Sequence, residues 1–279
     1  MKAIKKAIMK TMRLASCGRG IGAGLALVLL MPVFALAWLQ ISSQAWAETP
    51  ADCRVAETQL DNSFPLPRVE AAISNKKLAI LVLGAGSSRL PGPQGTLLAY
   101  PARLQSALAQ KLPGVAVTVV ADVKLGRTAR DMLVDMRAAV AAPPRPALVV
   151  WQTGTVDAVR SVDPEAFTRT LTKGVTAAKA AGADVVLMNM QYSPRTESMI
   201  ALGNYADSMR WVALQFEVPL FDRFQVMKTW NEMGTFDLYR DTKKMDIAER
   251  VHDCIGRLLA DLIIGAAKPG GAVPPIDVK

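Results

Sequence analysis

Three short loops carry the side chains that could do chemistry, and each of them follows a run of apolar residues. The first loop holds Ser87, the second holds Gly126, and the third ends the stretch LVVWQTGTVD at residues 148–157. In an open parallel sheet, ligands bind where the strands end at their carboxyl edge. A serine at that edge becomes a nucleophile only when a base lies within hydrogen-bond reach of it. The sequence therefore predicts a ligand or active site built from these loops.

Alternating strand and helix patterns position the three loops. Apolar runs of strand length occupy residues 78–83, 115–120, 147–151, 184–188 and 218–221. Helical patterns occupy residues 101–112, 129–140, 164–181, 204–216 and 247–264. Apolar strands without polar alternation, separated by helices, favour a parallel sheet covered on both faces. We expect an α/β fold, namely a flavodoxin-like three-layer α/β/α sandwich with a mainly parallel five-stranded sheet.

The loops and their order resemble those of the SGNH (GDSL-type) hydrolases over most of residues 78–264. In that family a Ser after the first strand, a Gly after the second and an Asn after the third meet a late Asp-x-x-His. The Ser attacks an ester carbonyl, the His carries its proton, and the Asn and two backbone N–H groups bind the oxyanion. The resemblance implies the site of an ester hydrolase at this edge.

The first loop departs from the family pattern at the nucleophile. In the stretch LGAGSS (residues 83–88), an ungapped alignment places Gly86 at the nucleophile position, with Ser87 one residue late. A shift of one residue in a tight turn points the side chain elsewhere. Two interpretations stay open: a turn with solvated hydroxyls, or a displaced nucleophile at Ser87.

The second loop keeps the family glycine, and the third loses its donor. Gly126 takes the oxyanion-hole position, although a glycine there could serve only the tight turn. The third loop, residues 154–157, keeps Gly154 but has Val156 in place of Asn. Losing one oxyanion donor costs about 3 kcal/mol in an active site. Asp157 is expected to be a helix N-cap or turn residue rather than a base.

The late segment, residues 236–246, contains no His. Depending on the anchor of the alignment, Lys244 or Asp246 falls at the His position. The single His of the chain, His252, lies inside a predicted amphipathic helix, where a structural role is the simpler interpretation. Without a His near a Ser, the usual proton path is missing. Weaker polar candidates for the same edge are Gln191, Tyr192 and Arg223.

The first 47 residues read as a signal peptide. Six Lys or Arg residues and no acidic residue precede an apolar run from about residue 21 to residue 39, and Ala45-Trp-Ala47 offers a cleavage site. An uncleaved membrane anchor is the alternative, since the run is almost long enough to span a bilayer. Either outcome predicts export, most simply to a bacterial periplasm. Residues 48–76 are expected to be an irregular extension, residues 77–266 the domain, and residues 267–279 a disordered tail.

The net charge, the cysteines and the lack of cofactor motifs indicate which partners, bridges and cofactors to expect. The net charge is +9, and subtracting the six basic residues of the leader leaves +3, which does not indicate nucleic-acid binding. Two cysteines remain after cleavage, Cys53 and Cys254. In an oxidising compartment we expect a disulfide between them, the alternative being two unlinked cysteines. Neither zinc spacing nor a phosphate-binding glycine loop is present, so no metal or cofactor is expected.

The interpretation is a catalytically degenerate SGNH-like protein that binds an envelope glycan or a protein partner in the former cleft. The family resemblance suggests an acylated glycan or another small-molecule ester as the ligand. One alternative is an active acyl or acetyl esterase that uses Ser87 with an unusual base, Lys244 or His252. Another is a structural or assembly factor of the cell envelope, with the cleft filled by side chains.

Overall fold

The computed structural model describes residues 53–56, 59–60, 64–239 and 245–268, all within the compact unit Ala45–Lys279. The predicted signal peptide lies outside these residues, as do residues 269–279 of the predicted tail. Whether the leader is cleaved therefore stays a prediction. Among the described residues, none of the helices is both long and apolar enough to cross a membrane.

A five-stranded parallel sheet forms the centre of the domain, as the apolar runs predict. Its order is β2-β1-β3-β4-β5, and every neighbouring pair is parallel. β3 and β4 are buried along their whole length because helices cover both faces. β2 is an edge strand and is only partly covered, so Val120 is exposed. The strands are β1 (Lys77–Gly84), β2 (Ala116–Val123), β3 (Leu148–Gln152), β4 (Asp184–Met188) and β5 (Leu220–Phe221).

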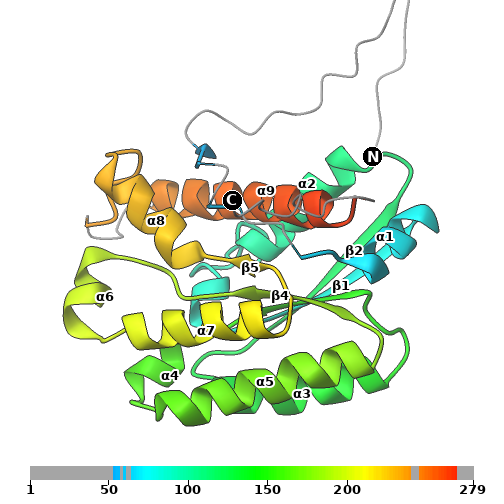
Figure 1. The fold of residues 1–279 in the computed structure, drawn as a ribbon. Helices are drawn as coiled ribbons and strands as arrows, with labels where there is room; N and C mark the ends of the chain where they lie inside the picture. Colours follow the sequence, from blue (N-terminus) through cyan, green and yellow to red (C-terminus); the bar gives the residue numbers. More distant parts are fainter. Residues whose placement is uncertain (1–52, 57–58, 61–63, 240–244, 269–279) are drawn as a thin grey trace, which may run out of the picture. The chain divides into compact units, whose positions relative to one another are not determined.

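Helices lie on both sides of the sheet, which confirms the three-layer sandwich (Figure 1). The helix α2 (Tyr100–Lys111) packs on α9 (Met245–Ala266) on one side. On the other side α5 (Pro164–Ala180) lies between α3 (Ala129–Ala141) and α7 (Gly203–Gln215). Short helices missed by the sequence patterns are α4 (Thr155–Val159), α6 (Pro194–Met199) and α8 (Arg223–Glu232), together with the 3-10 turn η3 (Gly86–Ser88).

The expected irregular extension before residue 77 was partly wrong, because residues 67–74 form a helix, α1 (Pro67–Ser74). Pro67 begins the helix instead of preventing it, since the first turn needs no N–H from that residue. The carboxylate of Asp184, at the start of β4, accepts the N–H groups of Arg68 at 2.8 Å and Val69 at 2.9 Å. The helix is thus capped by a side chain distant in the sequence.

The expected disulfide is present between Cys53 and Cys254 and is confirmed. Both cysteines are buried, and Cys254 lies in α9. The indole of Trp230 also donates a hydrogen bond to the carbonyl oxygen of Arg54 at 3.3 Å. The bridge therefore fixes the first described residues against the helices on one side of the sheet.

We predict that reduction of this disulfide, or Cys53→Ser, lowers the free energy of unfolding by about 2–4 kcal/mol. The bridge spans 201 residues, so it removes much of the conformational entropy of the unfolded chain. Urea unfolding with and without a reductant measures the change. Ser106→Ala, at an exposed helix serine outside the bridged pair, leaves the bridge intact and serves as the control. Equal unfolding midpoints with and without reductant would contradict the prediction.

A glycine in α5 allows that helix to approach the sheet closely. A Cβ atom on Gly174 would lie 2.1 Å from Cζ3 of Trp151, which is fully buried in β3. The indole therefore occupies the space that any other residue at position 174 would need. Gly174 and Trp151 together set the spacing between α5 and the sheet.

We predict that Gly174→Ala destabilises the protein by about 1–3 kcal/mol through overpacking. In an unconstrained helix interior the same change would stabilise by about 0.5–1 kcal/mol. Gly203→Ala is the matched control, because a Cβ on Gly203 meets nothing within 4 Å. Thermal and urea unfolding of the two variants test the prediction, and equal stability of both would refute it.

Candidate functional site

Strand register brings the three predicted loops to one edge of the sheet. Leu83 of β1 pairs with Trp151 of β3, Gly84 pairs with Val123 at the end of β2, and Gln152 pairs with Met188 of β4. The loops that follow these strand ends therefore start side by side. As the sequence predicts, they meet at the carboxyl edge, where ligands bind in folds of this kind.

The first loop turns its two serines toward the end of β3. The hydroxyl of Ser87 donates to Oε1 of Gln152 at 3.3 Å, and the buried Ser88 hydroxyl bonds to the same oxygen. Ser88 also lies 3.3 Å from the hydroxyl of Tyr100. A Cβ on Gly84 would lie 2.1 Å from Oγ of Ser88. The corner of the site beside Gly84 is therefore filled by a serine side chain.

Gly86, at the family's nucleophile position, faces the second loop. A Cβ on Gly86 would lie 3.3 Å from a methyl carbon of Leu125, the side chain of which is 70% exposed. Gly126 has φ +71°, a conformation that favours glycine. The tight turn at this position therefore accounts for the glycine. Its neighbour in space is the guanidinium of Arg160, 3.5 Å from a Cβ built on Gly126. This corner is open at its surface.

A buried arginine that the sequence analysis missed locks the first two loops together. The guanidinium of Arg127 donates to the carbonyl oxygen of Gly84 at 2.9 Å. It also forms ion pairs with Asp122 at 2.9 Å and Asp135 at 2.5 Å. Arg127 is 6% exposed. The Arg127 guanidinium therefore joins β1, β2 and α3, and its charge is paired within the fold instead of facing a ligand.

The third loop is also packed from within. Gly154 has φ +102°, and a Cβ there would lie 2.5 Å from Sδ of Met190. Val156 packs partly buried against the hydrophobic core, so it supplies no hydrogen-bond donor in place of the family Asn. The Gly154 corner is therefore filled, like the corner beside Gly84.

Asp157, expected to be a helix N-cap or turn residue rather than a base, caps a helix through its side chain. Asp157 lies inside α4, and its buried carboxylate accepts the N–H of Ala129, the first residue of α3, at 3.0 and 3.1 Å. Thr153 donates to it as well, at 3.3 Å. Burial raises the pKa of the Asp157 carboxyl despite these bonds. Asp157 caps a neighbouring helix, which holds the second loop against the third.

The late residues do not complete a proton path among the described residues. Lys244 lies outside them, and Asp246 is exposed in the first turn of α9. His252 is buried, and its Nδ1 accepts the backbone N–H of Tyr100 at 3.0 Å. Burial, together with the positive charge of Arg223, lowers the pKa of His252 to about 3. His252 is therefore a neutral structural residue that joins α9 to α2, as the simpler interpretation has it.

Arg223, one of the weaker sequence candidates, lies fully buried behind the first loop. Its guanidinium donates to the carbonyl oxygen of Ser87 at 2.9 Å and lies 5.7 Å from the ring centroid of Tyr100. Among the described residues, no carboxylate pairs with it. Burial lowers the pKa of Arg223 to about 10 and raises that of Tyr100 to about 12. Of the other candidates, Tyr192 is buried against Phe224 and Gln191 is half-buried.

Besides Arg127, the sequence analysis did not single out Gln152 and Tyr100 at this edge. A signal for Gln152 was available, since it is a polar residue that ends an otherwise apolar strand. Tyr100 carried no such signal. Within the described part of the chain, no group of three or more His, Cys, Asp or Glu residues could hold a metal ion. The expectation that the protein uses no cofactor stays a prediction.

Solved structures share this fold. TesA is 24% identical, with a TM-score of 0.52 over 66% of this chain and 99% of its own. A variant of an acetyl xylan esterase from Geobacillus stearothermophilus is 20% identical (TM-score 0.54; 67% of this chain, 94% of that one). The psychrotrophic esterase EstA from Pseudoalteromonas sp. is also 20% identical (TM-score 0.50; 67% of this chain, 96% of that one).

The sheet order, the loops at its edge and these neighbours define an SGNH-hydrolase fold, which confirms the resemblance seen in the sequence. The chain belongs to the non-GDSL lipase-like family, whose model matches residues 52–269. No curated protein matches the chain in sequence.

We predict that His252 makes stability fall as the pH drops from about 6.5 toward 3. In the unfolded chain His252 binds a proton below about pH 6.5, whereas in the fold it stays neutral down to about pH 3. The free energy of unfolding should decrease by about 2 kcal/mol from this residue between pH 7 and pH 5.

His252→Asn is the matched variant, because its amide oxygen can still accept the N–H of Tyr100. Urea unfolding at both pH values gives the difference between wild type and variant. The loss between pH 7 and pH 5 should be smaller in the variant by that amount. Parallel pH profiles would show that His252 titrates normally in the fold.

Proposed function

We propose that this protein is a catalytically inactive member of its family that is exported and binds an envelope glycan or a protein partner. The observation that carries the proposal is the hydrogen-bond partner of the Ser87 hydroxyl. Its hydrogen bond runs to the amide oxygen of Gln152, at 3.3 Å. Within the described residues, no His, Lys or carboxylate is hydrogen-bonded to it, and an amide oxygen is not a base that can take its proton.

The oxyanion side of the reaction is weakened as well. Val156 cannot donate a hydrogen bond, and the loss of one such donor costs about 3 kcal/mol of transition-state stabilisation. The buried groups around Ser87 also titrate far from neutral pH: the pKa is about 3 for His252 and about 12 for Tyr100. An efficient acid–base pair needs pKa values near the working pH. Neither group meets that requirement.

A protein that binds without catalysing needs only an accessible surface. Part of the carboxyl edge of the sheet is accessible. Ser87 is half-buried, Leu125 is exposed, and the Gly126 corner is bordered by Arg160. We propose this part as the contact region for a small-molecule ester, a glycan or a partner. The choice of an envelope ligand follows from the leader and from the esterases that share the fold. Membrane association would follow only if the leader stayed attached.

Two other functions each have one observation in their favour. An active esterase would use the half-buried Ser87, and its fold is shared with known esterases. A structural or assembly factor is favoured by the filled corners at Gly84 and Gly154. The active esterase is disfavoured because, within the part of the chain that the structure describes, no base is hydrogen-bonded to Ser87. The second does not account for the open surface beside Gly126.

We predict that the protein hydrolyses p-nitrophenyl acetate no faster than a buffer blank, and that Ser87→Ala changes nothing. It should also resist labelling by a fluorophosphonate, which reacts only with an activated serine. A working active site accelerates its reaction by about 10⁶-fold or more, so even a small amount of an active serine hydrolase would give turnover clearly above the blank. Ser106→Ala is the control, since Ser106 is an exposed helix serine bonded to its own helix at 3.1 Å. Turnover or labelling that disappears only in Ser87→Ala would establish an active esterase.

A further inference from the structure

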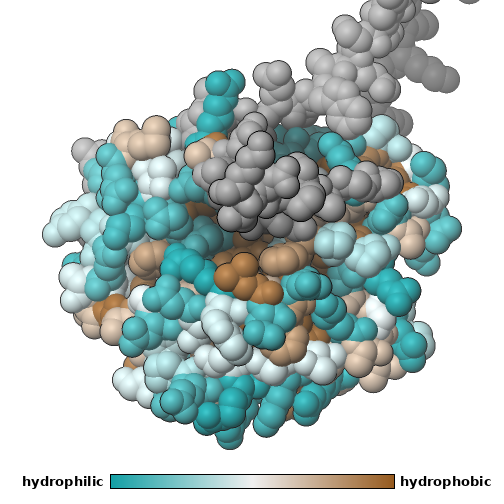
Figure 2. Space-filling model, in the orientation of Figure 1, coloured by the Kyte–Doolittle hydropathy of each residue, from teal (hydrophilic) through white to brown (hydrophobic). Residues whose placement is uncertain are grey.

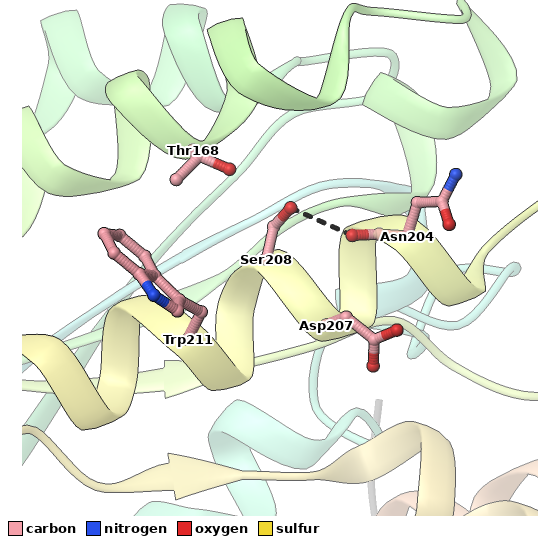
Figure 3. Close-up of a pocket in the computed structure, with 5 residues that line it drawn as sticks. All are labelled: Thr168, Asn204, Asp207, Ser208 and Trp211. Atoms are coloured by element: carbon pink, nitrogen blue, oxygen red, sulfur yellow. Dashed lines mark hydrogen bonds between the residues drawn. The ribbon is translucent and has the colours of Figure 1, made fainter.

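A shallow hollow between α5 and α7 combines one aromatic side chain with four polar ones. Its volume is about 460 Å³, and its lining consists of Thr168, Asn204, Asp207, Ser208 and Trp211. Figure 3 shows Thr168 of α5 facing the side of α7 that carries Ser208 and Trp211. Positions 204, 208 and 211 lie on one face of a helix because they are four and three residues apart. None of the three predicted loops contributes a residue to this hollow.

Trp211 is the aromatic platform of the hollow. Its side chain is 53% exposed, whereas Trp151 and Trp230 are fully buried in the core. An exposed indole offers a flat apolar face with a polar edge. On the face seen in Figure 2, apolar residues gather in small groups bordered by hydrophilic ones. A small ligand with both an apolar face and a polar rim suits this surface.

The polar groups of the hollow mainly accept hydrogen bonds. The hydroxyl of Thr168 donates to the carbonyl oxygen of Pro164 at 2.8 Å, and that of Ser208 donates to Asn204 at 2.9 Å. Each hydroxyl therefore has its proton engaged and its lone pairs available. The carboxylate of Asp207 adds further acceptor capacity. The best-matched ligand brings many O–H donors, as a saccharide ring does.

The charged groups at the hollow favour a neutral ligand over an anion or a cation. Asp207 already pairs with Arg210 at 2.7 Å, and Arg210 also pairs with Asp222 at 2.7 Å. Neither Lys nor Arg is among the residues that line the hollow, so an incoming anion would find no charged partner there. Because Asp207 is already neutralised by Arg210, the hollow does not need a cationic ligand either. A neutral pyranose, with C–H groups on its faces and hydroxyls on its rim, fits both conditions.

A second hollow, of about 530 Å³, continues from Asn204 and is mostly apolar. Its lining includes Val159 of α4, together with Met199 and Ile200 at the end of α6. Val159 and Met199 are 58% and 76% exposed, so apolar side chains stand at its rim. Asn204 lines both hollows. A ligand that crosses Asn204 would meet a polar and aromatic surface suited to a sugar on one side and an apolar surface on the other.

We propose that the groove along α7 binds a neutral saccharide that carries an apolar substituent. The sugar ring stacks on Trp211 and bonds to Thr168, Ser208 and Asp207, and the substituent lies in the apolar hollow beside Met199. This site is separate from the sheet edge, so it stands whether or not Ser87 is reactive.

The test is a titration of the full chain with octyl β-D-glucopyranoside, kept below its micelle-forming concentration, and with methyl β-D-glucopyranoside. The readout is the indole N–H signal of Trp211 in a nuclear magnetic resonance spectrum, assigned by its absence in Trp211→Phe. The octyl glycoside should shift this signal and leave those of Trp151 and Trp230 in place. The methyl glycoside should bind several-fold more weakly.

Variants then connect the shift to the groove, with affinities measured by calorimetry. Trp211→Ala should weaken binding of the octyl glycoside by about tenfold or more, and Thr168→Val by a smaller factor. Leu214→Ala is the matched control, because Leu214 is 65% exposed on the same helix and does not line the hollow. Unchanged unfolding temperatures show that the variants fold.

Three outcomes would overturn the proposal. The Trp211 signal could stay unmoved by both glycosides, Trp211→Ala could bind as well as Leu214→Ala, or tetramethylammonium could shift the signal in place of the sugar. Equal affinity for the two glycosides would show that the apolar hollow does not take part in binding. None of these outcomes bears on ester hydrolysis at Ser87, which the chromogenic assay measures separately.

Discussion

A single buried amide, that of Gln152, ties the loop after β1 to the end of β3, and the candidate site is arranged around it. Its oxygen accepts hydrogen bonds from both Ser87 and Ser88. A buried polar group without a partner costs about 1–3 kcal/mol, so these serines are held by a strong constraint. Both hydroxyls bond to the Gln152 oxygen, and neither is directed toward a base among the described residues, while the amide nitrogen of Gln152 has no partner there. The orientation of the two serines and the cohesion of this edge therefore have the same origin.

Charged residues at this edge serve packing in the same way. Arg127 joins the ends of β1 and β2 to α3 through Asp122 and Asp135. Arg223 supports the backbone of Ser87 from behind, without a carboxylate among the described residues. Burial, and after it the charge of Arg223, keeps His252 neutral. Catalytic sites use burial and charge to bring pKa values toward neutral pH. Here burial moves the pKa values away from neutral, to about 3 in His252 and about 12 in Tyr100.

Sequence patterns predicted the sheet, its helices and the meeting of the three loops, because apolar strands and turn glycines leave local signals. The disulfide was predictable because only two cysteines follow the leader. Short helices such as α1 and α4 left no such signal, since a helix of one or two turns is too brief for a periodic pattern. The capping role of Asp157 was predictable from its residue type, but the helix that it caps was not, because its partner, Ala129, is 28 residues away. The contact of Tyr100 with His252 spans 152 residues, and no local pattern could pair them.

The groove on α7 depends on packing that begins in the sheet. Trp151 of β3 fills the space beside Gly174, so α5 lies close against the sheet. The same helix carries Thr168 toward α7, which packs beside α5 and presents Asn204, Ser208 and Trp211. Rigid packing of this kind pre-organises a surface and lowers the entropic cost of binding. The hollow on α7 is therefore held by the packing of α5 and α7 and does not depend on the polar contacts at the strand ends.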